Sequence, residues 1–160
     1  MAFFRGPNIV TEDLFIQLDF TSPRCLNNGL TSVKNLADGG ETCTITNSGT
    51  DISIDTTTIG GGLKCLNWVG STAAYVDTPD TGNMALFSLE NWVYNVSGGN
   101  SRHSMFRNFW EIVGTSVQFW SYSFDNDYWR ASASNLVPYN EWTHIITTWD
   151  GTYVRHYING

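Results

Sequence analysis

The chain has 160 residues, of which 41% are hydrophobic and only 14% charged, and its formal net charge is −7. A length of this order is typical of one domain with a packed core. The acidic balance, with only eight lysines and arginines and no cluster among them, argues against nucleic acid as a partner. No apolar run reaches the roughly 18 residues that span a membrane, so we expect no membrane partner either.

The composition favours strands over helices. Threonine, valine, isoleucine and the aromatic residues suit strands, while asparagine and the 15 glycines suit the turns between them. Few lysines and glutamates are present to stabilise long exposed helices. We therefore expect an all-β fold.

The three cysteines, Cys25, Cys43 and Cys65, are odd in number and contain no C-x-x-C pair. This pattern argues against a zinc site and against the disulfide framework of a secreted protein. We expect buried free thiols instead. The apolar stretch in the first seven residues is too short for a signal peptide and is interrupted by Pro7, which favours a cytoplasmic origin.

The first half of the chain opens with a predicted arm, residues 1–13, which Pro7 keeps out of any helix. A strand is predicted at residues 14–20, and residues 21–41 are predicted to be mostly loop because turn-forming residues recur there. Alternation places four apolar side chains of the first strand on a core face: Leu14, Ile16, Leu18 and Phe20. Further strands are predicted at residues 42–47, 51–55, 63–69 and 73–77. Turns at this spacing favour a β-sandwich.

The second half is predicted to be a run of strands joined by short turns. These strands are predicted at residues 86–94, 104–108, 110–113, 117–124 and 128–132. Apolar residues on both faces of the first of them favour a central, two-sided position in a sheet. No sequence period repeats along the chain, which argues against a propeller or a solenoid.

Residues 142–160 are predicted to form a β-hairpin, because two β-branched and aromatic runs flank Asp150-Gly151. A two-residue turn at this dipeptide predicts that Ile146 lies opposite Arg155. Alternation places seven side chains on one face of the hairpin: Thr143, Ile145, Thr147, Trp149, Val154, His156 and Ile158. Because a hairpin alone is marginal in water, we expect further strands or a partner to cover it.

Three segments follow one another in a recognisable order: FSLENWV at Phe87–Val93, the aromatic stretch that opens with WEIV at Trp110, and residues 142–160 with WTHI, DG and YING. Together they resemble the laminin-G-like, or concanavalin-A-like, jelly roll over about residues 63–160. The resemblance implies an antiparallel two-sheet β-sandwich occupying residues 14–160, after the arm. It also implies that three tryptophans are largely buried: Trp92, Trp142 and Trp149.

The opening, RGPNIVT at Arg5–Thr11 followed by Leu14, Leu18 and Asp19, resembles laminin-G-like structural proteins in the virions of tailed, particularly marine, bacteriophages. This resemblance implies a non-enzymatic virion protein, a capsid decoration or fibre module, assembled in the cytoplasm of the bacterial host. Its partners would be other virion proteins, with a homo-oligomer also open. Relatives continue past the closing Asn-Gly, and a later strand pairs with their first one. We therefore expect a longer polypeptide or a second chain to pair with residues 14–20.

Catalysis is not predicted. Glycoside hydrolases of this fold use two neighbouring carboxylates, commonly as Glu-x-Asp-x-x-Glu, whereas the glutamates here are isolated. They are Glu12, Glu41, Glu90 and Glu111. The histidines, His103, His144 and His156, have no nucleophile motif nearby, so we expect structural roles for them.

No cofactor is expected, and calcium is the alternative because some relatives bind it through loop oxygens. The weak candidate ligands are aspartates expected in loops: Asp77, Asp80, Asp125 and Asp127. Aspartate is common in turns for reasons of its own, so turn formation is favoured over metal binding.

The candidate ligand- or partner-binding residues are aromatic and arginine side chains that the family would place in one sheet: Trp120, Tyr122, Tyr153, Arg155 and Tyr157. Such side chains suit the face of a pyranose and suit a protein partner equally well. Burial in a core or interface is favoured over binding of a surface glycan. A glycan-binding host-adhesion module of a tail fibre is the alternative function, and a carbohydrate-active enzyme comes third.

Overall fold

The computed structural model describes residues 14, 16–26, 30–37, 39–46, 51–57, 64–68, 75–78, 86–96, 102–106, 110–121, 128–131 and 134–160. Side chains are described for all of these except residues 75, 102–106, 120, 121 and 128–131. Every regular element in these ranges is a β-strand and none is a helix, which confirms the prediction of an all-β fold. The chain divides into two compact units, Met1–Thr81 and Gly82–Gly160.

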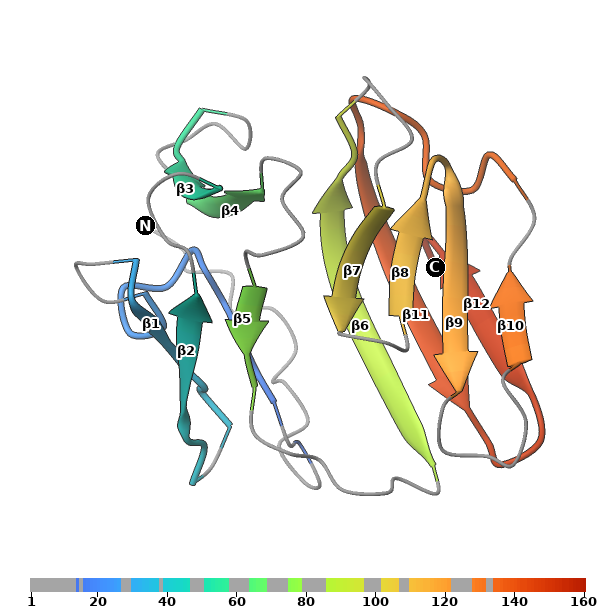
Figure 1. Ribbon diagram of the computed structural model, residues 1–160, viewed down its shortest axis with the longest axis horizontal. Helices are drawn as coiled ribbons and strands as arrows, with labels where there is room; N and C mark the ends of the chain where they lie inside the picture. The colour runs from blue at the N-terminus through green and yellow to red at the C-terminus, as the bar shows by residue number, and fades with distance from the viewer. Residues whose placement is uncertain are drawn as a thin grey trace, which may run out of the picture. The chain divides into compact units, whose positions relative to one another are not determined.

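The first unit contains a three-stranded antiparallel sheet and a separate antiparallel pair of strands (Figure 1). The sheet has the order β1 (Ser32–Lys34), β2 (Thr42–Thr46), β5 (Tyr75–Asp77), and the pair is β3 (Ile52–Asp55) with β4 (Cys65–Trp68). One hydrophobic cluster lies within this unit: Cys25, Leu26, Val33, Cys43, Ile45 and Ile52. Strands β2 to β5 all lie inside the ranges that the sequence predicts.

The prediction of a strand at residues 14–20 was wrong for the part of that segment that the structure describes. Gln17 accepts a hydrogen bond from the Leu36 N–H (2.8 Å), but it donates its own N–H to Oδ1 of Asn35 (2.8 Å). Because a side chain takes the place of a backbone acceptor there, a regular ladder does not form. Leu18 and Phe20 still pack against the core, as the alternation predicts.

The prediction that residues 21–41 are mostly loop missed β1. This strand pairs with β2 so that Val33 lies opposite Cys43, and both side chains are buried. Three residues are too few for alternation to be read in a sequence, so only the pairing with β2 reveals the strand.

All three cysteines are free. Cys25 and Cys43 are buried, as the sequence predicts, while Cys65 is half-buried. Burial raises the pKa of each of the three thiols above its ordinary value. A raised thiol pKa lowers the fraction of reactive thiolate at neutral pH.

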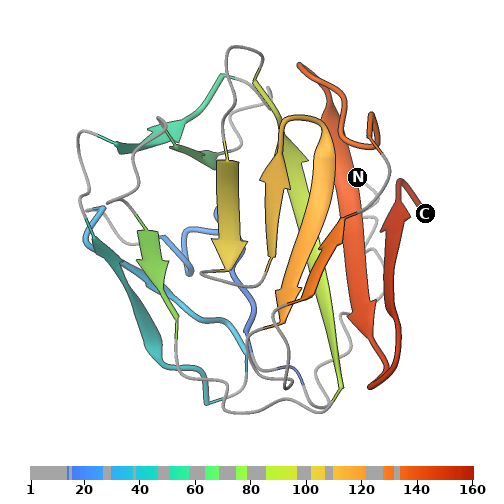
Figure 2. The ribbon, with the colours of Figure 1, turned by 45° about the vertical axis from the view of Figure 1, so that its right-hand side comes forward.

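The second unit contains two antiparallel sheets, visible in Figures 1 and 2. One has the order β10 (Tyr128–Ala131), β9 (Ser116–Ser121), β8 (Trp110–Val113), β7 (Arg102–Phe106). The other has the order β12 (Val154–Ile158), β11 (Trp142–Trp149), β6 (Phe87–Tyr94).

The two sheets of the second unit share one hydrophobic core. Its buried members come from both sheets and from the loop before β11: Val93, Trp110, Ile112, Val117, Phe119, Val137 and Ile145. The rings of Phe87 in β6 and Phe119 in β9 lie 5.5 Å apart between centroids. Two antiparallel sheets joined by a common apolar core are consistent with a β-sandwich.

The hairpin of β11 and β12 has a different register from the predicted one. Ile146 lies opposite Tyr157 rather than Arg155, so the prediction of a two-residue turn was wrong. The loop is four residues long because Oδ1 of Asp150 accepts the N–H groups of Thr152 (2.9 Å) and Tyr153 (2.7 Å). Gly151 supplies the positive φ, at 86°. This side-chain-capped turn is the kind that aspartate favours.

The register shift is two residues, so the alternation of faces survives it. On β11 the predicted inward residues are buried and their neighbours are half-buried. On β12 the predicted inward residues are half-buried and their neighbours are exposed. The prediction of which hairpin residues share a face is therefore confirmed.

The sequence predicts a central position for strand β6 in its sheet, and this prediction was wrong for the strands that the structure describes. In the described order β6 is a terminal strand, and β11 is the central one.

Of the three tryptophans expected to be buried, Trp149 is 8% exposed and Trp142 half-buried, but Trp92 is 62% exposed. Val93 points into the core, so its neighbour Trp92 must point outward. The prediction for Trp92 was wrong because an apolar outer face was interpreted as a covered one.

Replacing Trp92 by alanine is therefore expected to lower the free energy of unfolding by only about 0.5–1.5 kcal/mol. An exposed side chain contributes little burial, and an aromatic contact such as the one Trp92 makes with His144 is worth about 0.5–1.5 kcal/mol. Urea unfolding of wild type and Trp92→Ala measures this difference. A loss of about 3 kcal/mol or more would show that Trp92 is buried in solution.

A chain of polar contacts crosses the core of the second unit. Nε1–H of Trp110 in β8 donates to Oγ1 of Thr147 in β11 (2.7 Å), and that oxygen lies 2.9 Å from Nδ1 of His156 in β12. Thr147 is fully buried. Burial lowers the pKa of His156 below its ordinary value of 6.5, because the charged imidazolium is less well solvated there.

The lowered pKa of His156 makes stability depend on pH. The unfolded chain takes up a proton at about the ordinary value of 6.5, while the folded chain resists it until lower pH. This contribution to stability is present above pH 6.5 and is lost as the pH falls from 6.5 through the folded-state pKa. Urea unfolding between pH 7.5 and 5 should show a smaller loss for His156→Gln than for wild type. Equal losses would contradict the prediction.

Candidate functional site

The candidate site is the outer face of the β12-β11-β6 sheet, which we call the aromatic face. Alternation and register arrange its side chains in rows across the three strands. One row holds Trp92 and His144, the next holds Glu90, Ile146 and Tyr157, and a third holds Ser88, Thr148 and Arg155. Trp92 is 62% exposed and Tyr157 46% exposed. Two large exposed rings therefore stand on one sheet face.

Trp92 is held in place by His144. Their rings stack with centroids 4.7 Å apart and planes inclined by 25°. Nε2 of His144 lies 2.8 Å from Oε1 of Glu90, which is one row away on β6. The backbone of His144 is fixed as well, because its N–H donates to Oδ1 of Asn159 (3.0 Å) and its C=O accepts the N–H of Asn159 (2.9 Å).

The hairpin loop places a second set of groups at the end of β12. Nη1 of Arg155 donates to Oδ2 of Asp150, and the guanidinium lies 5.3 Å from the centroid of the Tyr153 ring. The hydrogen bond from Arg155 lowers the pKa of Asp150 to about 2, helped by the amides of Tyr153 and Thr152. Asp150 is therefore ionised at neutral pH. Tyr153 is 59% exposed, so a third ring is accessible at this end.

Three of the five predicted binding residues come together here: Tyr153, Arg155 and Tyr157. Trp120 lies in β9, in the other sheet, so the expectation that all five share one sheet was wrong. Tyr122 lies outside the described residues. The sequence reasoning missed Trp92, Glu90 and His144, although the strict alternation of β6 around Val93 carries the signal that Trp92 points outward.

The structure describes only one of the four weak metal candidates, Asp77. Asp77 is exposed. It is the last residue of strand β5, so it does not lie in a loop as expected for a metal ligand. Asp80, Asp125 and Asp127 lie outside the described residues. Among the residues that the structure describes, no three histidine, cysteine, aspartate or glutamate side chains are grouped as a metal ion requires.

The described ranges contain no helix that is long and apolar enough to cross a membrane.

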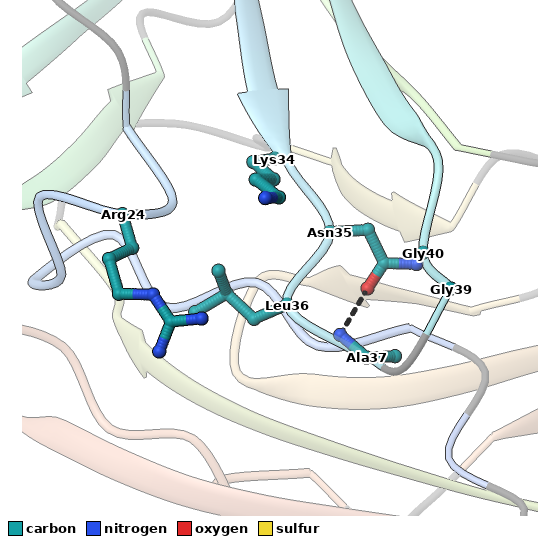
Figure 3. Close-up of a pocket in the computed structure, with 7 residues that line it drawn as sticks. All are labelled: Arg24, Lys34, Asn35, Leu36, Ala37, Gly39 and Gly40. Carbon is teal, nitrogen blue, oxygen red and sulfur yellow. Dashed lines mark hydrogen bonds between the residues drawn. The ribbon is translucent and has the colours of Figure 1, made fainter.

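A small open hollow lies in the first unit (Figure 3). It has a volume of about 240 Å³ and is lined by Arg24, Lys34, Asn35, Leu36, Ala37, Gly39 and Gly40. Oδ1 of Asn35 accepts the N–H of Ala37 (3.1 Å), and a Cβ on Gly40 would come within 2.6 Å of Cγ of Asn35. The Asn35 amide thus shapes the loop itself. The aromatic face, with its exposed rings, is the stronger candidate for binding.

Comparison of the chain with protein-family models, with curated proteins and with solved structures gave no match.

Proposed function

We propose that this chain is a non-enzymatic structural module of a phage virion, a capsid decoration or fibre module, built on a lectin-like jelly roll. The observation that supports it best is the aromatic face, because exposed rings on a regular sheet mark a surface for association. Trp92, Tyr157 and Tyr153 are all more than 40% exposed. The sequence resemblances described above supply the virion context, and other virion proteins are the proposed partners.

The groups on the aromatic face suit binding better than turnover. Arg155 and Asp150 are paired with each other, and His144 is engaged between Trp92 and Glu90. Groups fixed in this way present a rigid surface, which lowers the entropy lost on association. A host-adhesion module that binds a surface glycan is the second candidate, favoured by the exposed ring of Trp92.

Mass spectrometry of purified particles tests the proposal. Peptides of this chain should co-purify with intact virions through a density gradient, and antibody labelling should mark the head or a fibre. Recovery of the chain only in the soluble, particle-free fraction would contradict a virion role.

A further inference from the structure

We infer that the aromatic face binds an arginine side chain of a protein partner, with its guanidinium stacked on Trp92 and paired with Glu90; this rests on the proposed role of that face as a surface for association with other proteins. The face of an indole ring is electron-rich and attracts a cation that lies within about 6 Å of its centroid. A carboxylate beside the ring adds a charged acceptor. A site for a basic side chain therefore needs an accessible ring and an accessible carboxylate within reach of each other.

Trp92 supplies the ring. It stacks on His144 with centroids 4.7 Å apart, and its side chain is nevertheless 62% exposed. The next row of the aromatic face holds Tyr94 and Trp142, whose ring centroids lie 5.6 Å apart. Because its neighbours restrict the rotamer of Trp92, little conformational entropy remains to be lost when a partner side chain stacks on it.

Glu90 supplies the carboxylate. It lies two residues before Trp92 on the same face of β6, so the two side chains start roughly 7 Å apart. Its Oε1 lies 2.8 Å from Nε2 of His144, yet the side chain is 64% exposed. One guanidinium can therefore lie over the indole ring and reach the carboxylate at the same time.

The charges on the aromatic face favour a basic side chain over an apolar one. Arg155, in the next row on β12, is paired with Asp150. In the described part of the chain, no lysine or arginine forms an ion pair with Glu90. An apolar side chain on Trp92 would cover the Glu90 carboxylate without neutralising it, which costs free energy. A basic side chain covers the ring and neutralises the carboxylate together.

The chemistry of the guanidinium favours arginine over lysine. Its planar group stacks on an aromatic ring and donates parallel hydrogen bonds to a carboxylate, whereas an ammonium is a compact, strongly hydrated charge. Arginine is also enriched at the centres of protein interfaces. The net charge of −7 on the chain attracts a basic surface and repels an acidic one. The partner surface is therefore basic.

Titration of the full ¹⁵N-labelled chain, followed by NMR, tests this inference. The probe is a short acetylated peptide with one arginine among glycines and serines. The matched peptides carry lysine or citrulline, the neutral isostere of arginine, at the same place. We expect the indole N–H signal of Trp92 to shift saturably with the arginine peptide, with a higher Kd for the lysine peptide and no saturation with the citrulline peptide.

Variants locate the site. Glu90→Gln should raise the Kd of the arginine peptide about threefold, as loss of an exposed ion pair does. Trp92→Leu, followed through the backbone N–H signal of His144, should raise it about fivefold. The matched control is Glu41→Gln, which removes an exposed carboxylate from the first unit and changes the net charge equally. It should leave the Kd unchanged.

Four outcomes overturn the inference: no shift with the arginine peptide, equal Kd for the arginine peptide and either matched peptide, equal Kd for wild type and Glu90→Gln, or equal weakening by Glu41→Gln. Association with purified virions is measured separately. If the arginine peptide does not bind but Trp92→Ala abolishes this association, the guanidinium site is wrong and the virion function stands. If the peptide binds as expected but the chain is absent from particles, the site stands and the virion function fails. Circular dichroism of each variant confirms that the sheets are retained.

Discussion

Replacing Trp110 by alanine is expected to lower the free energy of unfolding of the second unit by about 3–5 kcal/mol, as large aromatic truncations in cores do. Trp110 is fully buried in β8 and belongs to the core that joins the two sheets. Its removal leaves a cavity and also leaves Thr147 without the indole donor. Urea unfolding followed by far-UV circular dichroism measures the loss.

Two variants separate the sources of this loss. Trp110→Phe keeps most of the apolar volume but removes the hydrogen bond to Thr147, so it should cost less than Trp110→Ala. Trp92→Ala removes the same side chain from an exposed position of the same unit. If Trp110→Ala costs no more than Trp92→Ala, the shared core of the two sheets is not formed in solution.

Replacing Asn95 by alanine is expected to lower the free energy of unfolding by about 2–4 kcal/mol, because one buried and one partly buried hydrogen bond are lost and their carbonyl acceptors lose this donor. Nδ2 of Asn95 donates to the carbonyls of Gly114 (2.9 Å) and Val137 (3.2 Å), and the residue is buried. These hydrogen bonds link the residue after β6 to the β8-β9 turn and to the loop before β11. Chemical denaturation at pH 7 measures the effect.

The control for Asn95→Ala is Asn67→Ala, which removes an exposed asparagine from β4. That change should alter stability by no more than about 0.5 kcal/mol. A cost below about 1 kcal/mol for Asn95→Ala would show that the side chain does not bridge these loops in solution.

On the aromatic face, some side-chain positions follow from alternation along one strand, and others depend on how the strands pair. Alternation alone predicts that Tyr157 and Arg155 share a face of β12, and the structure confirms it. The stack of Trp92 on His144 joins residues of two strands that lie far apart in sequence. It exists only because β6 pairs with β11 in one particular register.

The sequence by itself determined the strands and turns whose signals are local. Strand β8 lies at the predicted residues, and the following turn falls at Gly114, whose φ of 59° suits glycine. The inward face of β11 and β12 also follows from alternation, because a period of two does not depend on what covers the strand. The free, buried state of Cys25 and Cys43 follows from composition.

Only the tertiary structure decided the remaining features. The hairpin register depends on Oδ1 of Asp150, which accepts hydrogen bonds from two backbone N–H groups. These bonds give a four-residue loop in place of the two-residue turn that the Asp-Gly dipeptide predicts. Strand β1 exists through its pairing with β2, and residues 14–20 form no strand in their described part because the Asn35 side chain replaces a backbone acceptor. The exposure of Trp92 depends on what covers β6, and a sequence pattern that is apolar on both faces cannot distinguish a second layer from a binding surface.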